Sequence, residues 1–192
     1  LTNQITSGSL AFSDAFTGAL ARDTGEDVGT YAITQGTLAL SANYDLTYAG
    51  ANLTITVRPV KVTADAKSKV YGDADPSLSY QITSGSLAFS DAFSGALTRE
   101  AGEDVGTHAI NQGTLALSDN YALTYVGANL TITVRPVTVT ADAKSKLYGD
   151  ADPDLTYQIT SGSLAFSDAF TGELTRVAGE NVGMYAIEQG TL

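Results

Sequence analysis

Apolar and polar residues alternate in short stretches of this chain. In residues 130–135, Leu, Ile and Val fall on one side of an extended chain, and two Thr and an Arg fall on the other. The same alternation continues in residues 137–140, directly after Pro136. A period of two is the pattern of a strand that buries one face. We therefore predict two strands separated by a proline, which cannot donate to a sheet ladder.

Further strands are predicted wherever β-branched and aromatic residues are enriched between turn signals. These stretches are residues 78–83, 95–99, 107–117 and 121–126. Turn dipeptides such as Ser84-Gly85 and Gln112-Gly113 separate them. Several short strands at this spacing are typical of a small sandwich. The pattern thus predicts an all-β chain built from small β-sandwich-like units.

One stretch departs from the strand pattern. Phe89 and Phe93 are four residues apart and would share one face of a helical turn. A single turn of helix is expected there, and a long helix is not. A full helix at this point would instead make the unit an α+β, β-grasp-like fold with one short helix, and this alternative stays open at the level of sequence.

The chain repeats itself with a period of 77 residues. Self-similarity at a fixed period indicates an array of structural units. Taking the prolines at 59 and 136 as boundaries gives a partial unit at 1–58, a complete unit at 59–135 and a partial unit at 136–192. Only Arg135-Pro136 joins two predicted strands, which is too short for a flexible linker. We therefore expect a stiff, extended rod whose repeats contact their neighbours.

The chain begins and ends inside a repeat on this phase. One hypothesis is that it is a window from a longer polymer. Another is that incomplete end units of neighbouring copies complete each other by strand exchange. Partners are accordingly expected to be neighbouring repeats of the same chain and other copies.

Composition excludes several classes of function. The net charge is −11 and the pI is near 4.2, whereas nucleic acids and anionic membranes need clustered Lys and Arg. No apolar run is long enough for membrane insertion. Cysteine is absent, which removes disulfides, thiolate zinc sites and thiol nucleophiles. Abundant Thr, Ser, Gly and Ala with few charged residues favour an extracellular location.

Candidate chemistry is sparse, and no catalytic residue is predicted. The single histidine, His108, is replaced by Tyr31 and Tyr185 in the other copies, so no repeated reaction can depend on it. Three alternating carboxylates, Asp150, Asp152 and Asp154, follow the spacing of a calcium loop, but the Gly and Glu that such a loop needs are missing. The copy in the preceding repeat retains two of them as Asp73 and Asp75. No cofactor is expected, and calcium at these aspartates is the one metal hypothesis.

A set of motifs in fixed order resembles a known family. The motifs are Lys69-Val70-Tyr71-Gly72-Asp73-Ala74-Asp75-Pro76, Ile82-Thr83-Ser84-Gly85, Gly102-Glu103-Asp104-Val105-Gly106-Thr107, Asn120-Tyr121-Ala122-Leu123-Thr124-Tyr125 and Asn129-Leu130-Thr131-Ile132-Thr133. They are similar to tandem MBG domains of the Tyr-Gly-X type, found in large, filamentous-haemagglutinin-like bacterial surface adhesins. The resemblance spans the chain and implies a secreted, non-catalytic stalk at the bacterial cell surface.

Two further functions remain open. Many weak copies could bind a host glycan or matrix protein with avidity, using Tyr48, Tyr80, Tyr125 and Tyr157 as stacking residues if they are exposed. Alternatively, copies could self-assemble into an extracellular filament through open sheet edges. Burial of most of the four tyrosines would favour the spacer.

Overall fold

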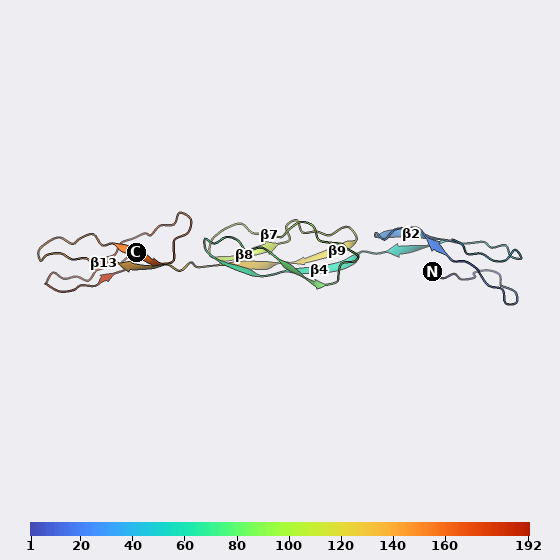
Figure 1. Ribbon diagram of the computed structural model, residues 1–192, viewed down its shortest axis with the longest axis horizontal. Coiled ribbons are helices and arrows are strands. Elements are labelled where there is room, and N and C mark those ends of the chain that lie inside the picture. Colours follow the sequence, from blue (N-terminus) through green and yellow to red (C-terminus); the bar gives the residue numbers. More distant parts are fainter. The chain divides into compact units, whose positions relative to one another are not determined.

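The computed structural model describes all of residues 1–192 and contains strands, turns and loops but no helix (Figure 1). The strands are β1 (Ala21–Arg22), β2 (Gly29–Thr34), β3 (Ala51–Ile55), β4 (Arg58–Ala64), β5 (Lys67–Val70), β6 (Tyr80–Ser84), β7 (Thr98–Arg99), β8 (Gly106–Asn111), β9 (Tyr121–Val126), β10 (Ala128–Thr133), β11 (Thr138–Ala141), β12 (Tyr157–Ser161), β13 (Thr175–Arg176) and β14 (Ile187–Glu188). The fold is all-β, as the alternating pattern predicts.

The chain forms two compact units, and each contains parts of more than one repeat. The first unit comprises Leu1–Thr63, Gln81–Ala96 and Thr114–Val126, and the second comprises Ala64–Tyr80, Leu97–Gly113 and Gly127–Leu192. The middle repeat, residues 59–135, therefore contributes to both. The division into repeat units at Pro59 and Pro136 stays a prediction.

The first unit holds two three-stranded sheets, in the orders β1-β2-β3 and β6-β4-β9. β2 is antiparallel to both β1 and β3. β4 runs parallel to β9, with Arg58 opposite Tyr121 and Thr63 opposite Val126 (Figure 1). Along β4, Val60 and Val62 are buried while Lys61 is exposed, which is the alternation that a half-buried strand requires.

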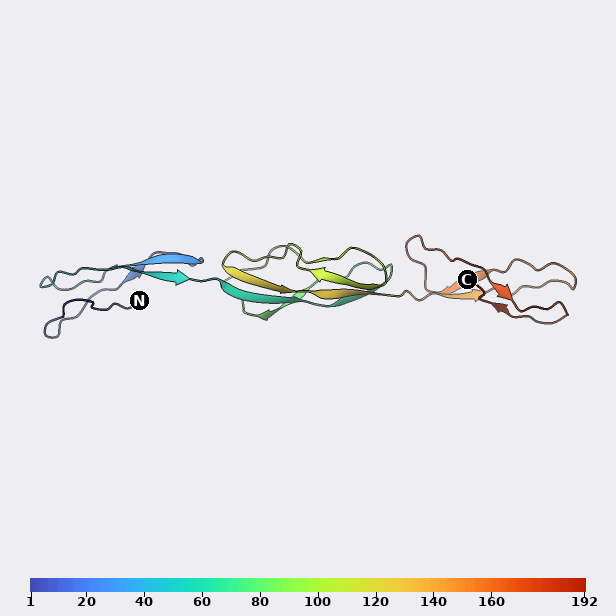
Figure 2. The same ribbon diagram turned by 180° about the vertical axis from the view of Figure 1, so that it is seen from behind.

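The second unit contains the largest sheet, in the order β5-β10-β8-β7, and the two-stranded sheets β11-β12 and β13-β14. β10 is one of the two inner strands of this sheet and lies between β5 and β8. Figure 2 shows the strands from behind. It pairs in parallel with β5, where Leu130 lies opposite Lys67, and antiparallel with β8, where Leu130 lies opposite His108. Leu130 and Ile132 are 0% and 1% exposed, so this central position buries the apolar face of β10 completely.

Several predicted strands are confirmed with shifted bounds. The stretch 121–126 is β9, whereas 130–135 becomes β10 and ends at Thr133, leaving Val134 exposed. The prediction for 107–117 is too long, because the Gln112-Gly113 turn ends β8 at Asn111. Beyond that turn, Ala116 forms only an isolated bridge with Ser94.

The expected helical turn around Phe89 and Phe93 is wrong. Ala88 and Asp91 form a reverse turn, with the amide of Asp91 donating to the carbonyl of Ala88 at 3.1 Å. Phe89 itself has a φ of 51°, in the left-handed region that no right-handed helix uses. Phe12 and Phe166 have the same φ of 51°. The α+β alternative is therefore not adopted.

The central position of β10 predicts unequal costs for identical substitutions. Leu130→Ala should destabilise the second unit by about 2–5 kcal/mol, because a fully buried leucine leaves a cavity. Leu53→Ala, the same change in the half-buried copy on β3, is the matched control and should cost less. Native-state hydrogen exchange of the amides in β10 and β3 reads the two sites separately. Equal losses would contradict the assigned role of β10.

Candidate functional site

The most densely connected polar group of the middle repeat consists of Lys69, Asp75, Arg99 and Glu103, called here the ionic cluster. Lys69 Nζ donates to Asp75 Oδ1 at 2.6 Å and to Glu103 Oε2 at 2.5 Å. Arg99 Nε donates to Asp75 Oδ2 at 2.6 Å, and Arg99 Nη2 also bonds Glu103. Each cation thus contacts both carboxylates, so the four charges form a closed, net-neutral ring.

Strand geometry explains why a lysine lies at its centre. On β5, Lys69 points inward next to Ile132 of β10, and only 4% of its side chain is exposed. A buried ammonium needs hydrogen-bond partners of opposite charge. Asp75 comes from the loop after β5, and Glu103 from the loop after β7. The carboxylates of Asp75 and Glu103 are thus the partners of the Lys69 ammonium at the edge of the sheet.

The ring fixes the charge state of all its members. Hydrogen bonds from Arg99 and then Lys69 lower the pKa of Asp75, and hydrogen bonds from Lys69 and then Arg99 lower the pKa of Glu103. Hydrogen bonds to Asp75 and Glu103 raise the pKa of Lys69. A general base or amine nucleophile needs the opposite shifts. The cluster is therefore arranged as a structural ion-pair ring.

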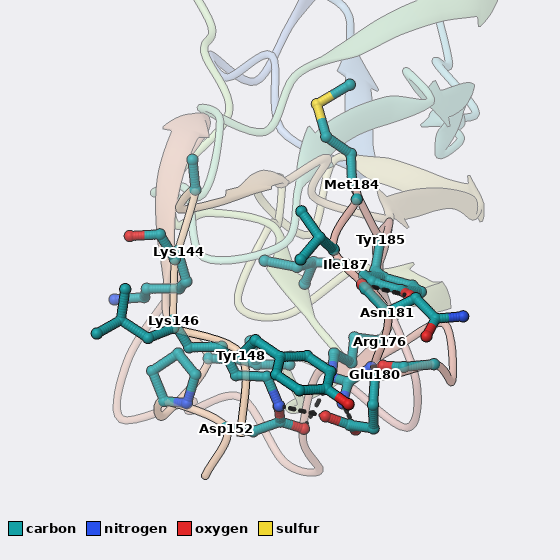
Figure 3. Close-up of a pocket in the computed structure, with 18 of the residues that line it drawn as sticks. Lys144, Lys146, Tyr148, Asp152, Arg176, Glu180, Asn181, Met184, Tyr185 and Ile187 are labelled. Atoms are coloured by element: carbon teal, nitrogen blue, oxygen red, sulfur yellow. Dashed lines mark hydrogen bonds and ion pairs between the residues drawn. The ribbon is translucent and has the colours of Figure 1, made fainter. Parts of the chain in front are cut away.

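The third repeat carries the same ring with Lys146, Asp152, Arg176 and Glu180, as Figure 3 shows. All four contacts measure 2.7 Å, and the Lys146 side chain is 23% exposed. Hydrogen bonds from Arg176 and then Lys146 hold the pKa of Asp152 at about 2. In the first repeat only Arg22 and Glu26 form the corresponding pair.

The five aspartates of the calcium hypothesis do not converge on one point. Asp75 and Asp152 belong to the two rings, and Asp73 pairs with Arg135. The backbone carbonyl of Asp150 accepts a hydrogen bond from Lys146 Nζ at 3.2 Å, and Asp154 is exposed. No group of three or more His, Cys, Asp or Glu is placed to hold a metal ion. Calcium binding stays an untested hypothesis, and the ring contacts give these carboxylates a different role.

His108 and its tyrosine copies share one structural contact. A ring nitrogen of His108, Nε2, lies 2.9 Å from the carbonyl oxygen of Asp104. Tyr31 and Tyr185 donate through their hydroxyls to the carbonyls of Asp27 and Asn181, both at 2.8 Å. In all three copies an aromatic ring closes the loop before its strand, so nothing in this contact assigns catalysis to His108.

The four tyrosines considered for sugar stacking, Tyr48, Tyr80, Tyr125 and Tyr157, are all half-buried. Tyr48 donates to the carbonyl of Ile33 at 2.9 Å, and Tyr157 packs edge-to-face on Phe170 with ring centroids 5.3 Å apart. These rings are used for packing within the units.

The family model of the MBG domain (YGX type) matches residues 1–54, 60–131 and 137–192. The chain belongs to the MBG family. Neither the curated proteins nor the solved structures contain a match to it. Tandem MBG domains are structural repeats typical of extracellular proteins. No helix long and apolar enough to cross a membrane is present.

The ionic cluster of the MBG repeat was not predicted from the sequence, although its aspartates were. The signal that could have found it is the recurrence of the same four charges at the same spacing. Lys69, Asp75, Arg99 and Glu103 recur as Lys146, Asp152, Arg176 and Glu180, and Arg22 and Glu26 stand at the last two of these positions in the first repeat. Two basic and two acidic positions that recur together in this way could have indicated the ring.

Removing the central cation should destabilise the repeat. Lys69→Met leaves Asp75 and Glu103 close together with only Arg99 to neutralise them. The free energy of unfolding should fall by about 1–3 kcal/mol. The loss should be smaller than in a fully dry interior, because both carboxylates are partly exposed. Lys61→Met, on the exposed face of β4, is the matched control and should change stability little. Thermal unfolding of the two variants measures their loss of stability. If Lys69→Met loses no more stability than Lys61→Met, the ion-pair ring does not stabilise the repeat.

The low pKa of Asp152 predicts acid sensitivity. Because the folded pKa of about 2 lies below the ordinary value of 3.8, the stability from this group is present above about pH 4 and is lost as the pH falls towards 2. Asp152→Asn should lower the melting temperature at neutral pH and flatten its dependence on pH in that window. An unchanged pH profile would show that Asp152 is not paired in solution.

Proposed function

We propose that this chain is a segment of the stalk of a secreted bacterial cell-surface adhesin, in which MBG repeats act as a stiff, non-catalytic spacer. The observation that carries the proposal is the shortness of the connections between ladder strands of successive repeats. β3 ends at Ile55 and β4 begins at Arg58, so only two residues separate them. β10 ends at Thr133 and β11 begins at Thr138.

Side-chain contacts between neighbouring repeats support stiffness at these connections. In the first unit, Asn120 Nδ2 donates to Asp27 Oδ1 at 2.8 Å, and Asn120 Oδ1 accepts from the amide of Val28, also at 2.8 Å. In the second unit, Tyr71 packs edge-to-face on Phe166 with ring centroids 5.4 Å apart. A flexible linker would leave such neighbours without fixed contacts.

The adhesive alternative, binding of a host glycan or matrix protein, has less support. Its proposed stacking residues are half-buried in packing contacts. The ionic clusters are closed rings with no free carboxylate directed at a ligand. The spacer needs only repetition, short connections and contacts between neighbours, and these features recur along the chain.

Small-angle scattering on three complete repeats, phased at the prolines, tests the spacer. The maximum dimension should grow by a constant increment per repeat, because short connections fix the repeats. The maximum dimension should be the same in calcium and in EDTA, because Lys and Arg side chains of the chain already neutralise Asp73, Asp75 and Asp152.

The control carries a Gly-Ser insertion between Arg135 and Pro136, which should shorten the mean dimension by adding a flexible joint. An insertion without effect would mean that the native connection is already flexible, against the proposal. Shortening in EDTA would instead assign the acidic stretch to calcium.

A further inference from the structure

The Tyr-Gly-Asp turn of the middle repeat, residues 71–73, is fastened to the connection that leads into the third repeat. It is called here the latch turn. Arg135 Nε donates to the carbonyl of Tyr71 at 2.6 Å, and Arg135 Nη2 pairs with Asp73. Arg135 lies between the second and third matches of the family model, directly before Pro136. Its guanidinium therefore ties the latch turn to the chain that joins the two repeats.

The latch turn also fits closely against a turn of the third repeat. Gly72 has a φ of 84°, and a Cβ built on it would lie 2.3 Å from Cβ of Ala165. Glycine is therefore required both for the left-handed φ and for the close approach. The Tyr71 ring meets Phe166 edge-to-face with centroids 5.4 Å apart. The Tyr71 hydroxyl donates to Asp168, and this hydrogen bond raises the pKa of Tyr71.

The turn that receives the latch, residues 165–168, has the same form in every repeat. It is called here the receiving turn. In all three copies the amide of its aspartate donates to the carbonyl of its alanine at 3.0–3.1 Å, and its phenylalanine has a φ of 51°. In the middle repeat the hydroxyl of Tyr121 accepts from the amide of Ala88 at 2.8 Å and donates to Asp91 at 2.6 Å. Each repeat thus shapes its own receiving turn.

The latch turn is likewise shaped by its own repeat. The amide of its aspartate donates to the carbonyl three residues earlier in both copies, at 3.0 Å for Asp73 and 3.1 Å for Asp150. The φ of its glycine is 84° at Gly72 and 93° at Gly149. Two surfaces that are already formed lose little conformational entropy when they meet, so a small contact between them can be stable.

The residues on both sides of the contact recur along the chain. They are Tyr-Gly-Asp at 71–73 and 148–150, Arg-Pro at 58–59 and 135–136, and Ala-Phe-Ser-Asp at 11–14, 88–91 and 165–168. The contact seen between the middle and third repeats therefore uses only residues that successive repeats share.

We propose that the latch turn fixes the orientation of each MBG repeat relative to the next, and that its partner is the receiving turn of a following repeat of the same type. The proposal rests on the stalk function and names the contact that makes the stalk stiff. The partner is defined by its chemistry. It needs a residue as small as alanine to face Gly72 and an aromatic ring to meet Tyr71, and the connection needs an arginine to pair with Asp73. A neighbour without these features would be held by the connection alone.

Distances between spin labels test the latch, because the chain has no cysteine of its own. Ser68→Cys on β5 and Gln158→Cys on β12 place exposed labels in the middle and third repeats. Double electron–electron resonance on the 192-residue chain should give one narrow distance distribution. Gly72→Ala should about double its width, because the added methyl group collides with Ala165 and leaves the connection alone to hold the joint.

The matched control is Gly106→Ala in the same repeat. Its φ of 149° is also strained for alanine, but a Cβ built there meets nothing within 4 Å, so the distribution should stay narrow. Ala165→Leu gives a second test from the other side of the contact. It fills the space beside Gly72 without a left-handed φ in the latch turn, and it should broaden the distribution as Gly72→Ala does.

The outcomes separate the latch from the spacer. A narrow distribution that Gly72→Ala and Ala165→Leu both leave narrow overturns the latch but not the spacer, because the connection alone would then hold the joint. Equal broadening by Gly106→Ala and Gly72→Ala also overturns the latch, since backbone strain alone would explain it. A broad distribution in the chain that carries only the labels overturns both, because the joint is then flexible.

Discussion

The parallel pairing of β5 with β10 is the constraint on which the middle repeat depends. It joins Lys67 to Leu130, which are far apart in sequence, so forming the ladder costs the entropy of closing the long segment between them. Once formed, it places β10 in the centre of a four-stranded sheet and buries Leu130 and Ile132. A local hairpin could not do this, because parallel strands need a long crossover connection.

Identical sequences elsewhere in the chain show what this pairing contributes. The segment 51–55 has the sequence of residues 128–132, yet β3 lacks a parallel neighbour and its leucine and isoleucine are only half-buried. Lys69 and Lys146 each contact two carboxylates, but Lys69 is far less exposed because β10 covers it. Burial at the ionic cluster therefore follows from strand pairing, and the ion pairs satisfy a lysine that the sheet has already covered.

Sequence predicted the elements whose signal is local. The alternation of residues 130–135 and 121–126 indicated β10 and β9, because each strand carries its own apolar face. β5 escaped prediction, since Lys-Ser-Lys-Val has no apolar face and is a strand only through its partner. The aspartates were noticed for their spacing, but Lys69 and Arg99, which reach Asp75 from other segments, determine its role. The left-handed conformation of Phe89 has no local sequence signal, because the residue that usually marks such a conformation is glycine.

Near-identity of the repeats creates a competition that the chain must resolve. Any copy of the Lys-Ser-Lys segment matches any copy of the Ala-Asn-Leu-Thr-Ile segment, so sequence alone does not select the partner. Proximity selects the partner. A Lys-Ser-Lys segment in the same repeat as an Ala-Asn-Leu-Thr-Ile segment has a high effective concentration near it, and a segment of a second molecule must compete against that. Repeats whose own segments are paired are thereby protected from exchange.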